Sequence, residues 1–214
     1  MGNTVNLSKQ TVNLSKSETV NLSKISGGNL KDVMVGLGWD PAKMGLLTRL
    51  FGGQLAEYDL DAYVILLKDG KFSGRTSDIV YYKNLEYTHK GRDVIKHMGD
   101  DLTGRGAAKD KEQIYIDLSN LPKSISDVVV AVTLYKGYEK GQSLGNVSNT
   151  FIRVVDKNDN FELCNYGSKV ISEDFNAQSF IAGKFYKEGS DWQFKAIGES
   201  SRAKSILEVA ESFR

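Results

Sequence analysis

The chain of 214 residues is long enough to bury the core of one domain. Its 28 Lys and Arg residues nearly balance its 27 Asp and Glu residues, for a net charge of +1, so it lacks the basic excess expected of a protein that binds nucleic acid. No apolar run is long enough for a transmembrane helix, and no basic segment followed by an apolar one marks a secretory signal; we therefore expect a cytoplasmic protein, either in solution or peripheral to the membrane.

The first feature along the chain is a repeated hexapeptide, TVNLSK, at residues 4–9, 11–16 and 19–24. Within each copy, Val and Leu alternate with Asn and Ser, which is the period of a half-buried strand. Two copies could pair as a hairpin, or one copy could suffice for the fold while the others stay unpaired. We assign residues 1–29 to an N-terminal arm in which at least one copy pairs as a strand, and residues 30–214 to a single domain.

Short segments rich in Val, Ile, Tyr and Phe follow, separated by turn residues. Asp69-Gly70, between Leu67 and Phe72, predicts a tight hairpin. Many strands with few intervening helices predict a mainly β protein, an antiparallel β-sandwich. The predicted strands cover residues 32–37, 61–67, 78–82, 113–118, 128–134, 150–155, 162–166, 179–185 and 192–198.

Two segments depart from this pattern. Residues 201–213 predict a C-terminal amphipathic helix that caps the sandwich, because four apolar residues recur at helical spacing: Ile206, Leu207, Ala210 and Phe213. Residues 44–51, MGLLTRLF, form a short apolar segment. This segment either folds back onto the core or docks on a partner or a membrane surface.

Acidic residues just before a predicted strand provide the first candidate site. Glu57, Asp59 and Asp61 lie two apart, so in an extended chain their carboxylates share one face. No Lys or Arg lies between them. The three carboxylates therefore repel each other unless a cation offsets their charge.

A glycine-rich loop offers a second group of oxygen ligands. In GDDLTGRG, at residues 99–106, Asp100 and Asp101 supply carboxylates, and the glycines allow main-chain carbonyls to turn inward. Calcium binds roughly six to eight oxygens from such mixed sources. We predict a calcium site from the two acidic segments; the alternative is that these acids are solvated turn residues. Further oxygen donors nearby in the sequence are Asn84, Asp110 and Glu112.

Two other metal-binding patterns fail. His89 and His97 are too few and too poorly spaced for a zinc site, and we interpret both as surface or turn residues. Residues 156–160, DKNDN, begin like an EF-hand loop, but Phe161 stands where glycine is needed and Gly167 replaces the bidentate acid. We interpret this segment as a hairpin turn.

The sequence contains no pattern typical of catalysis. Cys164, the single cysteine, has no neighbouring base and cannot form an internal disulfide; we interpret it as a buried, inert thiol. A hydrolase that uses Asp59 and Asp61 with a metal would lack a nucleophile with its base. We therefore expect a binding protein and not an enzyme.

Six motifs, taken in order, resemble the TerD domain of bacterial tellurium-resistance and general stress proteins. The resemblance runs from about residue 30 to the C-terminus. It implies a β-sandwich fold with calcium bound in acidic loops. It also implies a role in responses to tellurite, phage or DNA-damaging agents, with no established enzymatic activity. The implied partners are tellurium-resistance and stress proteins at the inner membrane face. The motifs are VGLGWD (35–40), YDLDA (58–62), YYKNL (81–85), GDDLTGRG (99–106), VSNTFIRVV (147–155) and FYKEGSDWQFKAIG (185–198).

Carried over by position, the resemblance implies a set of metal ligands: Asp59, Asp61, Asn84, Gly99, Asp100, Asp101, Gly104, Asp110 and Glu112. The chain departs from the family at Glu57, where Asp is usual, and at Asp101, where Asn is usual. After Gly104, members usually continue with acids, which are replaced here by Arg105, Ala107, Ala108 and Lys109. Because fewer anionic ligands weaken calcium binding, we predict one Ca²⁺ site, with a second weak or absent.

Two functions stay open at this level. The first is a calcium-binding stress-response protein that acts as a non-enzymatic binding module. The alternative is a metal-independent protein that docks on a partner or a membrane through residues 44–51, or through edge-strand pairing of the N-terminal arm.

Overall fold

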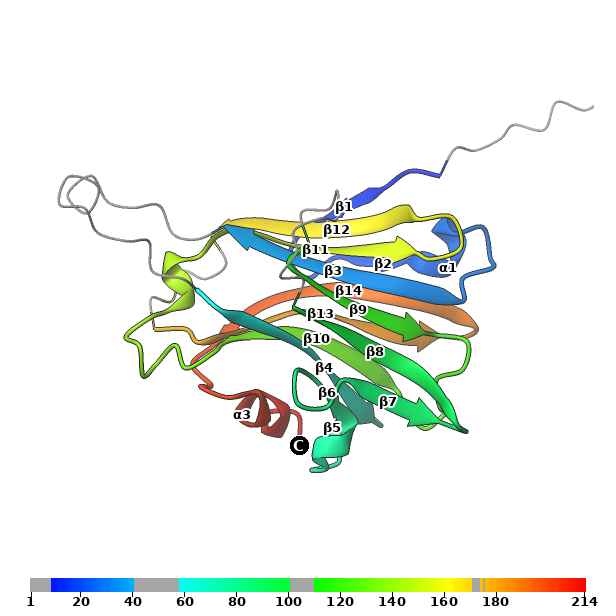
Figure 1. Ribbon diagram of the computed structural model, residues 1–214. Coiled ribbons are helices and arrows are strands. Elements are labelled where there is room, and N and C mark those ends of the chain that lie inside the picture. The colour runs from blue at the N-terminus through cyan, green and yellow to red at the C-terminus, as the bar shows by residue number, and fades with distance from the viewer. Residues whose placement is uncertain (1–8, 41–57, 101–109, 171–173, 175) are drawn as a thin grey trace, which may run out of the picture.

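The computed structural model describes residues 9–40, 58–100, 110–170, 174 and 176–214. These residues form two stacked β-sheets with a short helix beneath the lower one (Figure 1). Every strand pair is antiparallel except β1 with β12. The predicted antiparallel β-sandwich is confirmed. The apolar segment 44–51 lies outside the described residues.

The first sheet, sheet A, contains in spatial order β1 (Val12–Leu14), β12 (Phe161–Val170), β11 (Ser148–Asp156), β3 (Asp32–Asp40), β9 (Glu112–Asp117), β8 (Arg92–Asp100) and β7 (Glu86–His89). Sheet B contains β2 (Thr19–Asn21), β14 (Asp191–Ser201), β13 (Ser179–Glu188), β10 (Asp127–Leu134), β4 (Leu60–Lys68) and β5 (Lys71–Phe72), and β6 (Ile79–Val80) also pairs with β4. The helical segments are α1 (Leu22–Ile25), α3 (Ile206–Glu211) and two 3₁₀ turns, η1 (Thr76–Asp78) and η2 (Leu144–Asn146).

The predicted strands correspond to β3, β4, β9, β10, β11, β12, β13 and β14. Strand β9 begins and ends one residue earlier than predicted, and the others are one to five residues longer. The strand predicted at 78–82 is shorter, because η1 takes up Asp78 and Tyr81 already pairs with Asn84 in a turn. Strands β7 and β8 were not predicted from the sequence. In β8 charged side chains and a bulge between His97 and Asp100 interrupt the alternation.

The core lies between the sheets and continues beneath sheet B. Strand β4 is buried on both faces, so its sequence is nearly uniformly apolar. Ala62 and Val64 belong to the core between the sheets, while Tyr63 and Ile65 belong to a smaller cluster on the outer face of sheet B. Side chains two residues apart along β4 therefore lie on the same face of sheet B, and side chains of neighbouring residues lie on opposite faces.

Helix α3 covers part of that outer cluster. Ser205 caps it, since its hydroxyl accepts a hydrogen bond from Glu208 N at 3.2 Å. The predicted C-terminal amphipathic helix is confirmed but is shorter than residues 201–213: β14 extends to Ser201, and the helix covers Ile206–Glu211. Within it Val209 is buried, whereas Leu207 is 45% exposed. With four and six residues, the α-helices of the described segments are far too short to cross a membrane.

The two described copies of the hexapeptide become edge strands of different sheets. In the second copy, β1 pairs in parallel with β12, with Val12 opposite Cys164. In the third copy, β2 pairs antiparallel with β14, with Val20 opposite Phe194. The two copies do not form a hairpin with each other, because each completes a separate sheet.

Tight turns occur where the sequence predicts them. Asp69 and Gly70 both have positive φ, 52° and 73°, between the paired residues Lys68 and Lys71. Positive φ at both central residues defines the type I′ turn, whose twist matches the flanking strands. The hairpin predicted at this position is confirmed.

Candidate functional site

One end of the sandwich brings the two predicted acidic segments together. There β4 begins directly after Asp59, β8 ends at Asp100, and Asp100 pairs with Glu112 at the start of β9. The Glu112 carboxylate accepts a hydrogen bond from Ala62 N, 50 residues away in the chain. This bond joins sheet A to sheet B next to Asp61. We call this region the acidic end.

His97 lies buried at the acidic end, only 2% exposed. Gly99 N donates to its Nδ1 at 2.9 Å, so Nδ1 is an acceptor and the proton of the neutral ring sits on Nε2. Nε2 lies 3.0 Å from Ala62 O and 3.7 Å from the Glu112 carboxylate. The interpretation of His97 as a surface or turn residue is wrong, because both ring nitrogens find partners inside the sandwich.

Asp110 lies on the outer face of sheet A, on the side of the sheet opposite to Glu112. Arg153 binds it with two hydrogen bonds, of 2.8 Å from Nε and 2.7 Å from an Nη, and Gln113 donates a third at 3.2 Å. Hydrogen bonding to Asp110 raises the pKa of Arg153. Gly36 makes room for the pair, since a Cβ there would lie 2.5 Å from the Asp110 carboxyl group.

Asp59 and Asp61 project from the start of β4 on the outer face of sheet B. Asp59 is exposed, and Asp61 is half-buried and lines a cleft on that face. Since Ala62 faces the interior, Asp61 lies on the opposite side of β4 from Glu112. The two aspartates therefore share a face, as predicted from their spacing, and Glu57, the third acid of that prediction, lies outside the described residues.

The remaining predicted ligands differ in their contacts and in how much of each the structure describes. Asn84 donates its side-chain amide to Ile79 O at 2.7 Å, and Gly99 adopts a φ of 74° at the end of β8, a conformation that favours glycine. Only the main chain of Asp100 is described, and Asp101 and Gly104 lie outside the described residues. Within the described part of the chain, no three Asp, Glu, His or Cys side chains gather closely enough to hold a metal.

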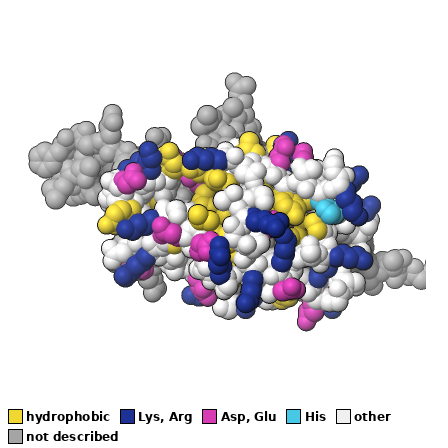
Figure 2. Space-filling model, turned by 90° about the horizontal axis from the view of Figure 1, so that it is seen from below, with side chains coloured by type: hydrophobic (Ala, Val, Ile, Leu, Met, Phe, Trp, Pro, Cys, Tyr) yellow, Lys and Arg dark blue, Asp and Glu magenta, His cyan; other side chains and the backbone are white. Residues whose placement is uncertain are grey.

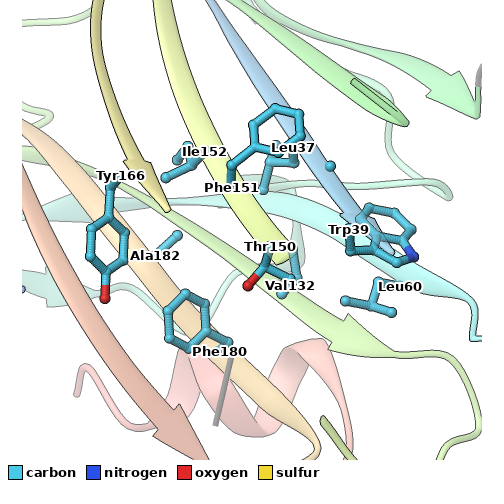
Figure 3. A pocket seen from close by; sticks show the side chains of 11 residues that line it. Leu37, Trp39, Leu60, Val132, Thr150, Phe151, Ile152, Tyr166, Phe180 and Ala182 are labelled. Atoms are coloured by element: carbon cyan, nitrogen blue, oxygen red, sulfur yellow. The ribbon is translucent and has the colours of Figure 1, made fainter. Parts of the chain in front are cut away.

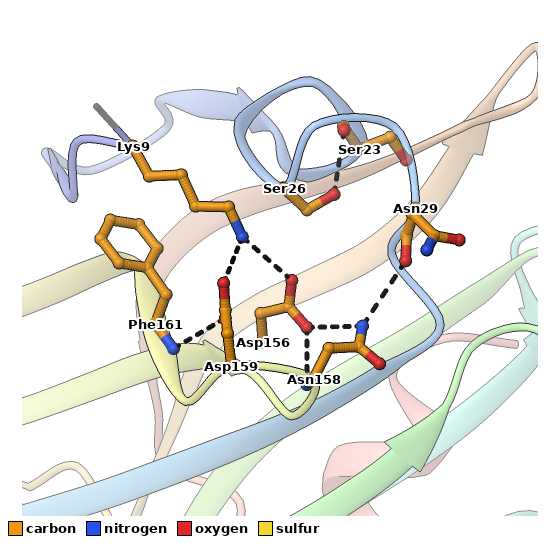
Figure 4. A network of polar contacts seen from close by, with 8 residues as sticks. All are labelled: Lys9, Ser23, Ser26, Asn29, Asp156, Asn158, Asp159 and Phe161. Atoms are coloured by element: carbon orange, nitrogen blue, oxygen red, sulfur yellow. Dashed lines mark hydrogen bonds and ion pairs between the residues drawn. The ribbon is translucent and has the colours of Figure 1, made fainter. Parts of the chain in front are cut away.

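The segment that begins like an EF-hand is a hairpin turn between β11 and β12, as predicted (Figure 4). Lys9, at the end of the first hexapeptide copy, lies 2.6 Å from Asp159 and 3.7 Å from Asp156. Asp156 also accepts from Asn158 N at 2.9 Å, and Asp159 accepts from Phe161 N at 3.1 Å. These carboxylates bind the arm and shape their own turn.

Cys164 is fully buried in β12. Burial raises the pKa of its thiol well above the usual range. The prediction of a buried cysteine is confirmed, and a thiol so difficult to ionise is a poor nucleophile.

A small apolar cavity lies between the sheets (Figure 3). Its volume is about 20 Å³, close to the minimum of about 10–15 Å³ that one water molecule needs. Trp39, Phe180 and Tyr166 are among the side chains that line it. The cavity is a packing gap of the core and too small for an organic ligand.

A larger hollow opens on the outer face of sheet B, which Figure 2 views from the α3 side. Its volume is about 310 Å³, and tyrosines and lysines from three separate segments line it together with Asp61. This cleft was not predicted from the sequence. The sequence feature that could have indicated it is the close spacing of aromatic and basic residues in YYK at 81–83 and YKGYEK at 135–140.

Comparison with known proteins yields a family and a set of named relatives. Residues 10–213 match a family described as TerD domain. The chain is 35% identical over 205 residues to the stress response protein SCP2 of Bacillus subtilis, covering 94% of this chain and 98% of that protein. It is 34% identical over 191 residues to the tellurium resistance protein TerD of Serratia marcescens, covering 88% of this chain and 90% of that protein.

A solved structure shares the fold. It is the crystal structure of a homologue of the telluride resistance protein TerD from Streptomyces coelicolor A3(2), with a TM-score of 0.60 and 20% sequence identity over 87% of this chain and 99% of that chain.

Proposed function

This chain belongs to the TerD domain family, and on that premise we propose that it is a stress-response protein of the tellurium-resistance type that binds calcium at its acidic end and acts by binding, not by catalysis. We place it in the cytoplasm or at the inner membrane face, with other stress proteins as partners.

The observation that carries the calcium proposal is the hydrogen bond between Glu112 and Ala62 N. It brings the β4 segment with Asp59 and Asp61 next to the β8–β9 segment with Asp100. Two segments that are distant in the sequence and carry candidate ligands thus lie next to each other at one end of the sandwich. Calcium sites typically collect oxygens from more than one loop in this way.

The candidate ligands differ in how readily they could bind a calcium ion. Asp59, Asp61 and the main chain of Gly99 and Asp100 offer oxygen ligands of the kind that calcium prefers. Asp110 and Glu112 would first have to leave Arg153 and Ala62 N, their present partners. We therefore assign ligand roles to Asp59, Asp61, Asn84, Gly99, Asp100, Asp101 and Gly104. Asp110 and Glu112 instead hold the neighbouring strands together.

A bound calcium ion would supply the positive charge that offsets repulsion among the carboxylates. The chain itself then contributes the rest: Glu112 and His97 hold β4 against β8 and β9, and the Asp110–Arg153 pair holds β9 against β11. These contacts hold the start of β4 next to the end of β8 before any metal arrives, which reduces the entropy lost on binding.

The non-enzymatic part of the proposal is supported by the surroundings of Cys164 and His97. The Cys164 thiol is buried with a raised pKa, and both nitrogens of His97 have hydrogen-bond partners within the sandwich. Neither has the exposed, activated form that nucleophilic or general-base catalysis requires.

Calorimetric titration of chelator-stripped protein with calcium tests the proposal. We expect saturable binding and a rise in Tm with calcium concentration, because a ligand that binds only the folded state stabilises it. The double variant Asp59→Asn/Asp61→Asn should lose both effects. Magnesium should bind more weakly, since it demands a smaller and more regular ligand shell.

The matched control is Asp159→Asn, which removes an acid from the EF-hand-like turn and should leave calcium binding unchanged. A melting temperature that stays constant up to millimolar calcium would refute the proposal. So would equal calcium affinity in the double variant and in the control.

A further inference from the structure

The cleft on the outer face of sheet B is built from aromatic rings. Tyr82 packs edge-on against Tyr81, with ring centroids 5.2 Å apart, and against Tyr135, with centroids 6.0 Å apart. Tyr82 is 37% exposed and the nearby Tyr138 is 63% exposed. Large aromatic side chains exposed beside a hollow offer flat surfaces on which a planar ring can stack.

Four lysines surround these rings. Lys136 and Lys140 each hold their ammonium group 5.5 Å from the centroid of Tyr135, Lys83 lies 5.4 Å from that of Tyr82, and Lys204 lies 3.3 Å from that of Tyr138. In the part of the chain that the structure describes, none of the four forms an ion pair with a carboxylate.

The carboxylates on the wall of the cleft are those of Asp61 and Glu139, against three lining lysines. With Lys140 beside them, the basic side chains outnumber the acidic ones. The aromatic faces compensate part of the lysine charge at present. An anionic group in the cleft would compensate it more strongly, through charge-assisted hydrogen bonds.

The backbone holds the lysines in place without a ligand. After β10 the chain turns sharply: Lys136 has a φ of 53°, and Lys140 N donates to Lys136 O at 3.0 Å. Gly137 allows this turn, because a Cβ there would lie 2.6 Å from the Leu134 side chain and the Gln178 amide. The turn places Lys136 and Lys140 on the same ring of Tyr135.

From this arrangement we propose that the cleft binds a small ligand that combines a planar ring with a phosphate group, namely a nucleoside monophosphate. The ring stacks on the exposed Tyr82, and the phosphate contacts Lys83, Lys136 and Lys204. The volume of about 310 Å³ lies at the lower end of the range of about 300–1,000 Å³ for small-molecule pockets. That size suits a mononucleotide better than a duplex or a folded domain.

Calorimetric titration with AMP, GMP, CMP and UMP in the presence of a calcium chelator tests this proposal independently of the calcium site. We expect at least one nucleotide to bind, and adenosine and inorganic phosphate to bind more weakly than AMP, since each supplies half of the ligand. The double variant Lys136→Gln/Lys204→Gln should weaken binding at least about ten-fold, the size expected for the loss of charge-assisted contacts.

The chain offers a matched control in two other lysines that lie over aromatic rings. Lys157 lies over Tyr115 and Lys187 over Trp192, so Lys157→Gln/Lys187→Gln removes the same charge and the same kind of contact elsewhere. Its nucleotide affinity should equal that of the unaltered chain. Failure of all four nucleotides at millimolar concentration overturns the proposal, as does equal loss in both double variants, or tighter binding of an acidic peptide or an oligonucleotide than of every mononucleotide.

Discussion

At the acidic end, Asp110 shows how another side chain of the same chain can bind a carboxylate that was predicted to be a metal ligand. The Asp110 side chain has no exposed surface and is bound by Arg153, whose side chain is 25% exposed. Gly36 leaves the space in which the carboxylate lies. Gly36, the first glycine of the VGLGWD motif, thus has a physical role: it leaves room for an ion pair on the outer face of sheet A.

The substitution Arg153→Met tests the structural role of this pair. It should lower the free energy of unfolding by about 2–4 kcal/mol, because it leaves a buried carboxylate without its cation. Urea denaturation measures the change. Arg202→Met is the matched control, since Arg202 pairs with Asp174 on the surface with 71% exposure; it should cost less than about 1 kcal/mol. Equal costs for the two variants would contradict a structural role for Asp110.

At the scale of elements, identical hexapeptides adopt different local structures. In both described copies the residues TVN or VNL form a short strand, but only the third copy continues into a helix, α1. There Asn21 caps the helix by accepting a hydrogen bond from Lys24 N at 2.9 Å. Asn13, its counterpart in the second copy, instead stays in β1 opposite Asn165. The strand that each copy joins decides its conformation.

This difference predicts unequal costs for the same substitution in the two copies. Val20 is 8% exposed in the core between the sheets, whereas Val12 is half-buried at the edge. Val20→Ala should lower the free energy of unfolding by about 2 kcal/mol, from the loss of two buried carbons and the cavity they leave. Val12→Ala should cost about half as much, and each variant is the other's control in urea denaturation. A larger cost at Val12 would show that the second copy carries more of the stability.

At the scale of the whole molecule, the two sheets share one core. Trp39 from β3 in sheet A and Trp192 from β14 in sheet B both belong to the cluster between them. A sheet that separated from its partner would expose this shared apolar surface. The two sheets therefore depend on each other for their stability.

Trp39→Phe and Trp192→Phe each leave one tryptophan, which reports on one sheet. In each variant, the unfolding transition followed by fluorescence should coincide with that followed by far-UV circular dichroism, as expected for cooperative unfolding. The unaltered chain, with both tryptophans, is the control for any effect of the substitutions on the midpoint. Separate transitions in either variant would mean that one sheet unfolds before the other.

The sequence by itself determined the strand-rich class, the turn at Asp69-Gly70, the C-terminal helix and the shared face of Asp59 and Asp61. These features depend on the alternation and turn propensity of neighbouring residues, which a local pattern records. Only the tertiary structure decided that identical hexapeptides join different sheets, that His97 is buried, that Arg153 holds Asp110, and that tyrosines and lysines from three segments form one cleft. Each of these depends on a partner far away in the chain, and no local pattern contains the position of that partner.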